Sequence, residues 1–472
     1  MIKRTVGQIT AMCGAKRQGG YEDMLLRGVT TDSRAVGGGG DLFVPLVGER
    51  FDGHDFAAQA AENGAKAMLW QKGRDIPADL PDVAFLVVRD TLAALQRLAS
   101  AYRNELMVRV VGITGSNGKT TTKDMTAALL STQYSVLKTE GNLNNHIGLP
   151  LTLLKLDEET EVAVLEMGMS GFGEIELLTK LASPDLAIIT NVGDAHLLHL
   201  GSRAGIAKAK LEIALGLGED GVLLYNGDEP LLKEGLAESA LPEGVTLRTF
   251  GLGADNEWSA DDIRLHPDQS VFAALHRGQV SGLGTVHIPV PGRHNISNAL
   301  AAIAAARFMG VPAEAIHRGF KELKLTGMRI EPVKAFNGAV ILNDAYNANP
   351  TAVRAAIDLV GGLESFGRRW IVLGDMLELG PEEAELHRGV GAYLTPDAAE
   401  GVLTCGPLSA NTHEGAKASL READEAGRVI HFNDKDTLAD WLKNRLQPDD
   451  LVLVKGSRGM RMEQVVQALE KG

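Results

Sequence analysis

The sequence has little cysteine: Cys13 and Cys405 are the only two in 472 residues. Two cysteines so far apart exclude a framework of several disulfides and a metal cluster held by thiolates, and they suit a reducing cytosol. Basic residues are also in the minority, because 47 Lys and Arg face 61 Asp and Glu, which gives a net charge of −14. This charge argues against nucleic acid or an anionic membrane as a partner of the whole protein. A local group of basic residues can still bind an anionic substrate.

Long apolar runs are missing too. No stretch approaches the roughly 20 apolar residues of a membrane-spanning helix. The N-terminal segment has basic residues but no apolar core, unlike a signal peptide. We therefore expect a cytoplasmic protein without membrane insertion, and we expect it to be a monomer.

What is present is an ordinary globular composition, with 44% hydrophobic and 23% charged residues, so cores of normal size can form. The length predicts about three domains. We place the boundaries near residues 106 and 325, which gives domains at 1–106, 107–325 and 326–472.

The clearest motif is the segment VRVVGITGSNGKTTTKDMTAALL at 108–130. A β-branched run leads into the turn Gly115-Ser116-Asn117-Gly118, and a helical pattern starts at Lys119 and Thr120. Strand, glycine turn and helix in this order are typical of a phosphate-binding loop, whose backbone N–H groups surround a polyphosphate. Lys119 would add positive charge, and the Thr120 hydroxyl could reach Mg²⁺. We interpret the segment as an ATP site. Because Ile113 stands where the usual pattern has glycine, a plain glycine turn in a βα unit stays the alternative.

Polar side chains also follow other predicted strands of the central domain. A glycine-flanked loop carries Asn142, Asn144 and Asn145, and Glu166 and His196 come at or just after the ends of buried strands. Ligands bind at the carboxyl ends of strands in α/β sheets, and a carboxylate there can hold Mg²⁺ through oxygen. The plainer interpretations are an exposed turn, an exposed acid and a structural histidine.

Two helical patterns complete the central domain. The pattern at 202–217 carries Lys210, for which a surface lysine is the ordinary expectation. A second helix carries His294, Asn295 and Asn298 in its first turns. These side chains could reach a base or a ribose, although capping alone would explain one of the asparagines.

The sequence after residue 325 alternates strands and helices, which predicts a parallel, doubly wound sheet. Its strand-end loops at 343–350, 374–380 and 455–458 would line a cleft facing the ATP domain. Lysine and arginine in the last loop suit a carboxylate, so this domain is expected to accept a co-substrate. In the first domain, Ser33 and Arg34 precede a glycine turn. They could bind a phosphate or sugar, or simply form a turn.

Several of these stretches together resemble the ATP-dependent Mur ligases, which add amino acids to the cell-wall precursor peptide. They are TDSR at 31–34, GNLNNHIGLP at 141–150, DAYNANP at 344–350, GDMLELG at 374–380 and KGSRGMRME at 455–463. The ATP loop TGSNGKTTT at 114–122 is a family form, which accounts for the missing glycine. The resemblance covers the whole chain. It implies an α/β protein of three domains: an N-terminal UDP-substrate-binding domain, a central P-loop mononucleotide-binding domain for ATP, and a C-terminal Rossmann-like domain with a parallel sheet for the incoming dipeptide.

The resemblance is strongest to the members that join D-alanyl-D-alanine to UDP-N-acetylmuramoyl-tripeptide in peptidoglycan precursor synthesis. It implies that the γ-phosphate of ATP activates the tripeptide carboxylate as an acyl phosphate, which the dipeptide amine then attacks, with two Mg²⁺ ions and Lys119 neutralising charge. Alternatives are a ligase that adds a diamino acid or lysine, and folylpolyglutamate synthase. An ATP-binding switch that does not ligate is a rival of another class.

The same resemblance implies roles for single residues. Lys119, Lys210 and His196 would be catalytic, and Lys210 would react with CO₂ to give a carbamate that ligates metal; a salt-bridging lysine is the alternative. Thr120 and Glu166 would hold one Mg²⁺, and Glu166 and His196 a second. The residues implied for ATP are Gly115, Ser116, Asn117, Gly118, Lys119, Thr120, Thr121, His294, Asn295, Asn298, Arg329 and Asp344. Those implied for the substrates are Ser33, Arg34, Asn142, Asn144 and Asn145 for the UDP-sugar, and Tyr346, Asn347, Asn349, Lys455, Ser457 and Arg458 for the dipeptide.

Overall fold

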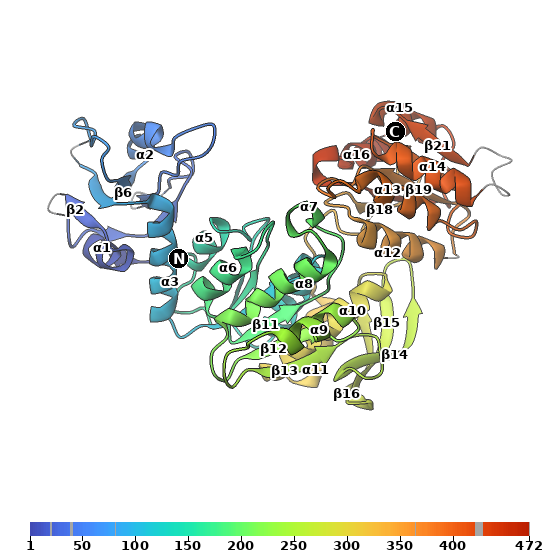
Figure 1. The fold of residues 1–472 in the computed structure, drawn as a ribbon, viewed down its shortest axis with the longest axis horizontal. Helices are drawn as coiled ribbons and strands as arrows, with labels where there is room; N and C mark the ends of the chain where they lie inside the picture. Colours follow the sequence, from blue (N-terminus) through green and yellow to red (C-terminus); the bar gives the residue numbers. More distant parts are fainter. Residues whose placement is uncertain (19–20, 38–40, 81, 364, 421–427, 472) are drawn as a thin grey trace.

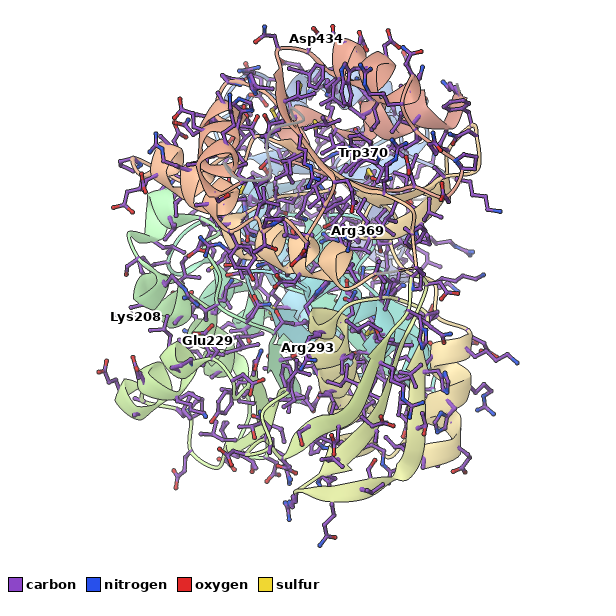
Figure 2. The ribbon with its side chains drawn as sticks, turned by 90° about the vertical axis from the view of Figure 1, so that its right-hand side faces the viewer. Lys208, Glu229, Arg293, Arg369, Trp370 and Asp434 are labelled. Carbon is purple, nitrogen blue, oxygen red and sulfur yellow. The ribbon has the colours of Figure 1, made fainter. Side chains whose placement is uncertain are left out.

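The computed structural model describes residues 1–18, 21–37, 41–80, 82–363, 365–420 and 428–471. The chain forms three bodies in sequence order, coloured blue, green to yellow, and orange to red (Figure 1), each built on its own main sheet. Figure 2 shows the C-terminal body, marked by Arg369, Trp370 and Asp434, above the central body, marked by Lys208, Glu229 and Arg293. Within the described residues, no helix has the length and apolar character needed to span a membrane.

The N-terminal body is a five-stranded sheet in the order β2-β7-β6-β5-β4, in which β2 runs antiparallel to β7. Helix α1 starts with a capping box between Thr5 and Gln8 and ends at left-handed Gly14, with φ 66°. The elements are β1 (Arg4–Thr5), α1 (Val6–Cys13), β2 (Lys16–Gln18), β3 (Leu25–Leu26), β4 (Gly28–Thr30), β5 (Asp41–Phe43), α2 (Ala57–Glu62), β6 (Ala65–Gln71), β7 (Ala84–Val88) and α3 (Thr91–Glu105).

The central body is a nine-stranded sheet in the order β16-β15-β14-β13-β12-β11-β8-β10-β9. Its parallel part contains β8 (Arg109–Thr114), β9 (Val136–Lys138), β10 (Val162–Glu166), β11 (Leu186–Ile189), β12 (Val222–Asn226) and β13 (Thr246–Phe250). Strand β8 lies between β10 and β11 and runs parallel to both. The loops that follow these three strands therefore meet at one edge of the sheet. Strands β14 (Trp258–Leu265), β15 (Ser270–His276) and β16 (Gln279–Ile288) extend the sheet, with β15 antiparallel to both of its neighbours.

Helices cover both faces of the central sheet. One face packs against α4 (Lys119–Leu130), α10 (Arg293–Phe308) and α11 (Ala313–Lys321). Helix α10 lies close because it is rich in alanine on its buried sides. The other face packs against α3 and against α5 (Gly148–Leu153), α6 (Glu174–Ala182), α8 (Arg203–Leu211) and α9 (Pro230–Glu238). The short helix α7 (Leu197–Leu200) precedes α8.

The C-terminal body is a six-stranded sheet in the order β17-β18-β22-β19-β20-β21. The predicted parallel, doubly wound sheet is confirmed, with one addition: edge strand β17 (Glu331–Lys334) is antiparallel to β18. Pro332 suits an edge because it has no N–H to donate to a second neighbour. The other elements are β18 (Val340–Asp344), α12 (Pro350–Gly361), β19 (Arg369–Gly374), α13 (Glu383–Ala392), β20 (Gly401–Cys405), α14 (Ser409–Ser419), β21 (Val429–Phe432), α15 (Lys435–Lys443), β22 (Leu451–Lys455) and α16 (Glu463–Lys471).

Two elements are shorter than their sequence patterns indicate. The apolar run at 42–46 has the pattern of a short buried strand, but strand β5 ends at Phe43, because Pro45 cannot donate to a ladder. The helix predicted over 202–217 ends at Leu211 and continues as a 3₁₀ turn, where the Ile213 carbonyl accepts the Thr179 hydroxyl at 2.8 Å. The domain boundaries near residues 106 and 325 stay predictions.

Candidate functional site

A cavity of about 420 Å³ lies at the carboxyl edge of the central sheet, and the C-terminal body forms its other wall. Many of the side chains that the sequence patterns indicate meet here. The central body contributes Ser116, Asn117, Gly118, Lys119, Thr120, Thr121, Asn144, Asn145, Glu166, His196, His294, Asn295 and Asn298, and the C-terminal body contributes Arg329, Asp344, Tyr346, Asn347 and Lys455.

The glycine turn between β8 and α4 has the backbone that only glycine adopts easily. Gly115 has φ 152° and Gly118 has φ 79°. A Cβ on Gly115 would collide with the Thr190 hydroxyl, and one on Gly118 would lie 2.5 Å from Asn298 Oδ1. Lys119 Nζ bends back to donate to the carbonyls of Gly115 at 2.7 Å and Ser116 at 3.3 Å. The Lys119 ammonium therefore lies against the turn. Because its glycines have no side chains, the backbone of the turn can approach a ligand closely.

Thr120, at the start of helix α4, touches Glu166, the last residue of strand β10, and both side chains are buried. The Thr120 hydroxyl donates to Glu166 Oε2 at 2.9 Å, and Asn144 Nδ2 donates to Oε1 at 2.8 Å. Glu166 is only 3% exposed. One carboxylate beside one hydroxyl suits Mg²⁺, which keeps several waters and takes few protein ligands when phosphates complete its shell.

His196 lines the same cavity, and Lys210 of helix α8 lies near enough for its charge to act on His196. His196 begins the turn into α7 with φ 62°, and its Nδ1 lies 3.3 Å from Glu378 Oε2 of the C-terminal body. Burial lowers the pKa of His196, and the charges of Lys119 and Lys210 lower it further against the opposing effect of Glu378.

Lys210 is 1% exposed. Burial and the nearby charge of Lys119 hold the pKa of Lys210 well below its ordinary value. Its ammonium group makes no hydrogen bond or ion pair with any residue that the structure describes. The salt-bridging role considered from sequence thus has no partner within the described residues.

Helix α10 presents its first turns to the cavity. Asn295 Nδ2 donates to the Pro291 carbonyl at 2.8 Å, and Asn298 Nδ2 donates to Asn295 Oδ1 at 3.2 Å. Burial lowers the pKa of His294 to about 4, with Asp344 raising it and Lys455 lowering it by smaller amounts. A neutral imidazole is therefore present at neutral pH.

Arg329 lies in the linker to the C-terminal body, between Met328 and Ile330, whose φ angles are 60° and 52°. Its guanidinium stacks on the Tyr346 ring with 4.2 Å to the centroid. Its Nε is buried, and no described residue accepts from it. This leaves a buried donor with a fixed positive charge, which suits an anionic ligand.

Residues of the C-terminal loops bind each other or the glycine turn at 115–118, which we call the ATP turn. Lys455 Nζ donates to Asp344 Oδ2 at 2.5 Å and to the Asn347 carbonyl at 3.0 Å. Asn349 caps α12 through the Ala352 N–H at 2.9 Å, and its amide also pairs with that of Asn117.

Other predicted residues do not line the cavity, and most of them have protein partners. The Ser33 hydroxyl donates to Gln59 at 2.6 Å, and exposed Arg34 pairs with Asp32 at 2.8 Å. The Ser457 hydroxyl donates to the Ala348 carbonyl and accepts from the Leu377 N–H, and Arg458 pairs with Glu463. Asn142 is exposed. The other predicted residues outside the cavity lining are Gly115, Lys210 and Asn349.

Sequence reasoning missed two residues that shape the ATP turn. The Thr190 hydroxyl donates to the Asn117 carbonyl at 2.6 Å, and Asn191 Oδ1 accepts from the Asn117 N–H at 2.9 Å. Both directly follow β11, so the rule that ligand sites lie at strand ends would have found them. The contact of Glu378 with His196 depends on how two bodies dock, and no local pattern signals it.

Three family models match the chain in the order of its three bodies. "Mur ligase family, catalytic domain" matches residues 25–103, "Mur ligase middle domain" 113–306, and "Mur ligase, glutamate ligase domain" 328–458.

Curated relatives match over the full length. The chain is 48% identical to the UDP-N-acetylmuramoyl-tripeptide–D-alanyl-D-alanine ligase of Bacillus subtilis (strain 168) over 99% of both sequences. It is 40% identical to the ligase of the same name from Escherichia coli (strain K12), over 100% of this chain and 99% of that one.

Solved structures are similar too. A crystal structure of MurF from Acinetobacter baumannii superposes with a TM-score of 0.87 at 30% identity over 100% of both chains. MurF ligase from Thermotoga maritima in complex with ADP gives 0.81 at 29% identity, over 94% of this chain and 97% of that one.

Proposed function

This chain belongs to the Mur ligase family, and we infer that its cavity is where ATP drives the formation of an amide. The protein is a ligase of peptidoglycan precursor synthesis that adds D-alanyl-D-alanine to UDP-N-acetylmuramoyl-tripeptide. The assignment to this cavity rests on one observation: the ATP turn, Glu166 and the C-terminal strand-end loops line the same cavity.

ATP is proposed to lie along the glycine turn with its phosphates on the N-terminus of α4. Lys119 and the buried Nε of Arg329 supply positive charge and a donor for the phosphates. The base then lies by the first turns of α10, where neutral His294 offers a flat ring and Asn295 and Asn298 offer amides. The ADP complex of the Thermotoga maritima relative supports the use of this nucleotide.

The reaction is proposed to run in two displacements. A carboxylate oxygen of the tripeptide attacks the γ-phosphorus, and ADP leaves, which gives an acyl phosphate. The dipeptide amine then attacks the acyl carbon, and phosphate leaves with the oxygen that came from the carboxylate. Because an acyl phosphate hydrolyses readily, water must be excluded. Contacts across the two walls, such as Asn117 with Asn349, support a role of the C-terminal body in covering the site.

The substrates are proposed to enter from opposite bodies. Ser33 and Arg34 of the N-terminal body, with the loop of Asn142, Asn144 and Asn145, would hold the UDP-sugar. On the other side, Tyr346, Asn347, Asn349, Lys455, Ser457 and Arg458 would face the dipeptide. The Lys455–Asp344 pair at 2.5 Å means that Lys455 offers a partly neutralised charge, which suits positioning a zwitterion more than binding a free anion.

Thr120 and Glu166 fit Mg²⁺, with His196 as the proposed further ligand. When bound, Mg²⁺ supplies positive charge that stabilises the transferring phosphoryl group. Two ions are proposed: Thr120 and Glu166 would hold one, and Glu166 and His196 would hold the other. The hydrogen bond between Thr120 Oγ1 and Glu166 Oε2 holds these two oxygens next to each other. Asn144 orients the carboxylate by donating to its other oxygen, Oε1.

Lys210 is proposed to carry a carbamate. Its lowered pKa favours the free amine, which is the form that reacts with CO₂. The N–C bond forms with loss of one amine proton, and the product is an anion with two oxygens. Such a group would offset the positive charge of Lys119 and could ligate metal, whereas a buried lysine without a partner is costly.

A phosphate-release assay with a panel of amines tests the assignment. We expect release that requires both UDP-N-acetylmuramoyl-tripeptide and D-alanyl-D-alanine. Release with a UDP-dipeptide and a diamino acid or lysine, or with a folate and glutamate, would identify one of the related ligases instead. Basal hydrolysis indifferent to every muramyl peptide would identify a non-ligating switch. A cytoplasmic monomer remains our proposal for location and assembly.

A further inference from the structure

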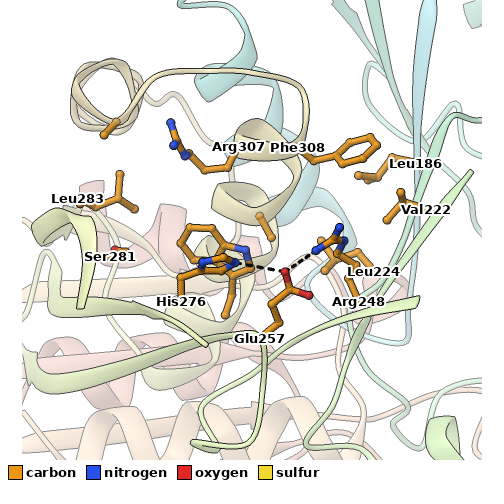
Figure 3. A pocket seen from close by; sticks show the side chains of 14 residues that line it. Leu186, Val222, Leu224, Arg248, Glu257, His276, Ser281, Leu283, Arg307 and Phe308 are labelled. Carbon is orange, nitrogen blue, oxygen red and sulfur yellow. Dashed lines mark hydrogen bonds and ion pairs between the residues drawn. The ribbon is translucent and has the colours of Figure 1, made fainter. Parts of the chain in front are cut away.

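A second cavity, of about 350 Å³, lies at the opposite end of helix α10 from the first cavity. Figure 3 shows the side chains that line it. Asn295 and Asn298 face the first cavity from the start of α10, and Phe308 faces the second cavity from its last residue. At a rise of 1.5 Å per residue the two ends are about 20 Å apart. None of the described residues lines both cavities. We refer to this second cavity as the α10 pocket.

The walls of the α10 pocket are apolar and partly aromatic. Leu186 and Val222 come from the starts of β11 and β12, and Leu283 comes from β16. Trp258 is 8% exposed and its ring lies 4.7 Å from that of His276. Phe308 stands at the rim with 47% of its surface exposed. Both rings line the pocket, so each can pack against a flat ring bound in it.

One edge of the α10 pocket carries more positive than negative charge. Glu257 Oε1 lies 2.6 Å from Arg248 Nη1, 3.2 Å from His276 Nε2 and 3.6 Å from Arg277 Nη2. Figure 3 shows Glu257 between Arg248 and His276, with Arg307 and Phe308 across the pocket. Two arginines that stay charged, Arg248 and Arg277, thus share one carboxylate with His276. Arg307 adds a third guanidinium to the pocket wall, and its Nη1 donates to the Val311 carbonyl at 2.7 Å.

Arg248 keeps unused donors in this cluster. It donates to Glu257 through Nη1, and its Nε is buried without an acceptor among the described residues. A buried guanidinium donor without a partner is costly, and an added anion would relieve that cost. The Glu257 carboxylate lies beside the Arg248 guanidinium and would repel further negative charge on a bound ligand. A ligand with one negative charge is therefore favoured over one with two.

We propose that the α10 pocket is a binding site for a small, planar aromatic monoanion. Its ring lies between Trp258 and Phe308, and its anionic group lies on the Arg248 side. The volume is at the lower end of the roughly 300–1,000 Å³ of small-molecule sites, so the ring system is about the size of a fused bicycle. The site is distinct from those for ATP and the two peptides.

Isothermal titration calorimetry on the full chain tests this, with 1-naphthoate as the anionic probe and 1-naphthamide as its neutral match. We expect one site for 1-naphthoate, unaffected by saturating ADP. Arg248→Met should weaken 1-naphthoate about 10-fold and leave 1-naphthamide within about 2-fold, since only the charged probe uses the guanidinium. Phe308→Ala should weaken both probes about 5-fold. Phe336→Ala, at an equally exposed phenylalanine outside the pocket, is the matched control and should change neither.

The proposal is overturned if 1-naphthoate does not bind at millimolar concentration, if ADP displaces it, or if both pocket variants bind it as the wild type does. Equal loss of both probes in Arg248→Met would also contradict it, because the charge would then not matter. Should Arg248→Met fail to fold, Phe308→Ala still decides, because an exposed rim side chain can be truncated without opening the core.

Discussion

The side-chain amides of Asn117 and Asn349 hydrogen-bond to each other in both directions across 232 residues of sequence. Asn349 Nδ2 donates to Asn117 Oδ1 at 2.7 Å, and Asn117 Nδ2 donates to Asn349 Oδ1 at 3.3 Å. Asn117 belongs to the ATP turn and Asn349 caps the first helix of the C-terminal body. A conformational change in the ATP turn therefore alters a direct contact with the C-terminal body, which is proposed to deliver the dipeptide.

Replacing Asn349 separates this contact from helix capping. Asn349→Ser keeps an N-cap oxygen but loses the amide pair, whereas Asn349→Ala loses both. We expect both variants to lower kcat/KM for the dipeptide by about 3–10-fold, and only the alanine variant to lose about 1 kcal/mol of stability. Steady-state kinetics and urea unfolding distinguish the two effects. Unchanged kinetics in both variants would show that the amide pair has no part in catalysis.

Glu166→Gln tests the metal assignment with little change in shape. A glutamine can still meet Asn144 and Thr120, but it lacks the charge that attracts Mg²⁺. We expect kcat to fall about 100-fold or more, and the Mg²⁺ concentration for half-maximal activity to rise. Phosphate release over a Mg²⁺ titration measures both. Glu159→Gln, in the exposed turn before β10, should leave the titration unchanged, and a wild-type titration for Glu166→Gln would remove Glu166 from the metal site.

Lys210→Ala should abolish most activity, and a small added carboxylate such as formate should restore part of it by replacing the carbamate oxygens. Lys208→Ala is the matched control, because Lys208 lies on the same helix and is exposed. It should behave as the wild type, with or without formate. Full activity of Lys210→Ala in the phosphate-release assay would end the carbamate proposal.

The pKa of His294 predicts a loss of stability in mild acid. Because its folded-state pKa of about 4 lies below the ordinary 6.5, the unfolded chain binds the proton more readily. The contribution of neutral His294 to the free energy of unfolding is fully present above pH 6.5 and is lost as the pH falls toward 4. The full loss is on the order of 3 kcal/mol, since one pKa unit corresponds to about 1.4 kcal/mol. Thermal unfolding at pH 7 and pH 5 should show a smaller drop in Tm for His294→Gln than for the wild type. His287→Gln, at an exposed position, should show the same decrease in Tm between pH 7 and pH 5 as the wild type. If His294→Gln and His287→Gln show equal decreases, the buried His294 is not the cause of the acid sensitivity.

The sequence predicts well those parts of the site that are local along the chain. The glycine turn before Lys119 and the strand-tip carboxylate of Glu166 could be found because strand, turn and helix patterns are short-range, and parallel strands bring their ends together. The alternation of strands and helices after residue 325 predicts the C-terminal sheet for the same reason. Helix α1 was readable as well, since Thr5 and Gln8 form a capping box, but it was not predicted.

Contacts between bodies could not be predicted in this way. The pairs Asn117–Asn349 and His196–Glu378 depend on how two separate sheets dock, and no periodicity encodes that orientation. The Lys455–Asp344 pair joins adjacent parallel strands, and only the strand order, with β22 beside β18, brings the two side chains together.

The transfer of oxygen from substrate to phosphate tests the central claim most directly. UDP-N-acetylmuramoyl-tripeptide labelled with ¹⁸O in its terminal carboxylate is incubated with the protein, ATP, Mg²⁺ and D-alanyl-D-alanine, and the released phosphate is analysed by mass spectrometry. If the γ-phosphate activates that carboxylate in the cavity around Lys119, each phosphate released carries one ¹⁸O and each is matched by one new amide. Phosphate without label, released at the same rate as amide forms, would contradict the acyl-phosphate route and the roles assigned to the residues around it.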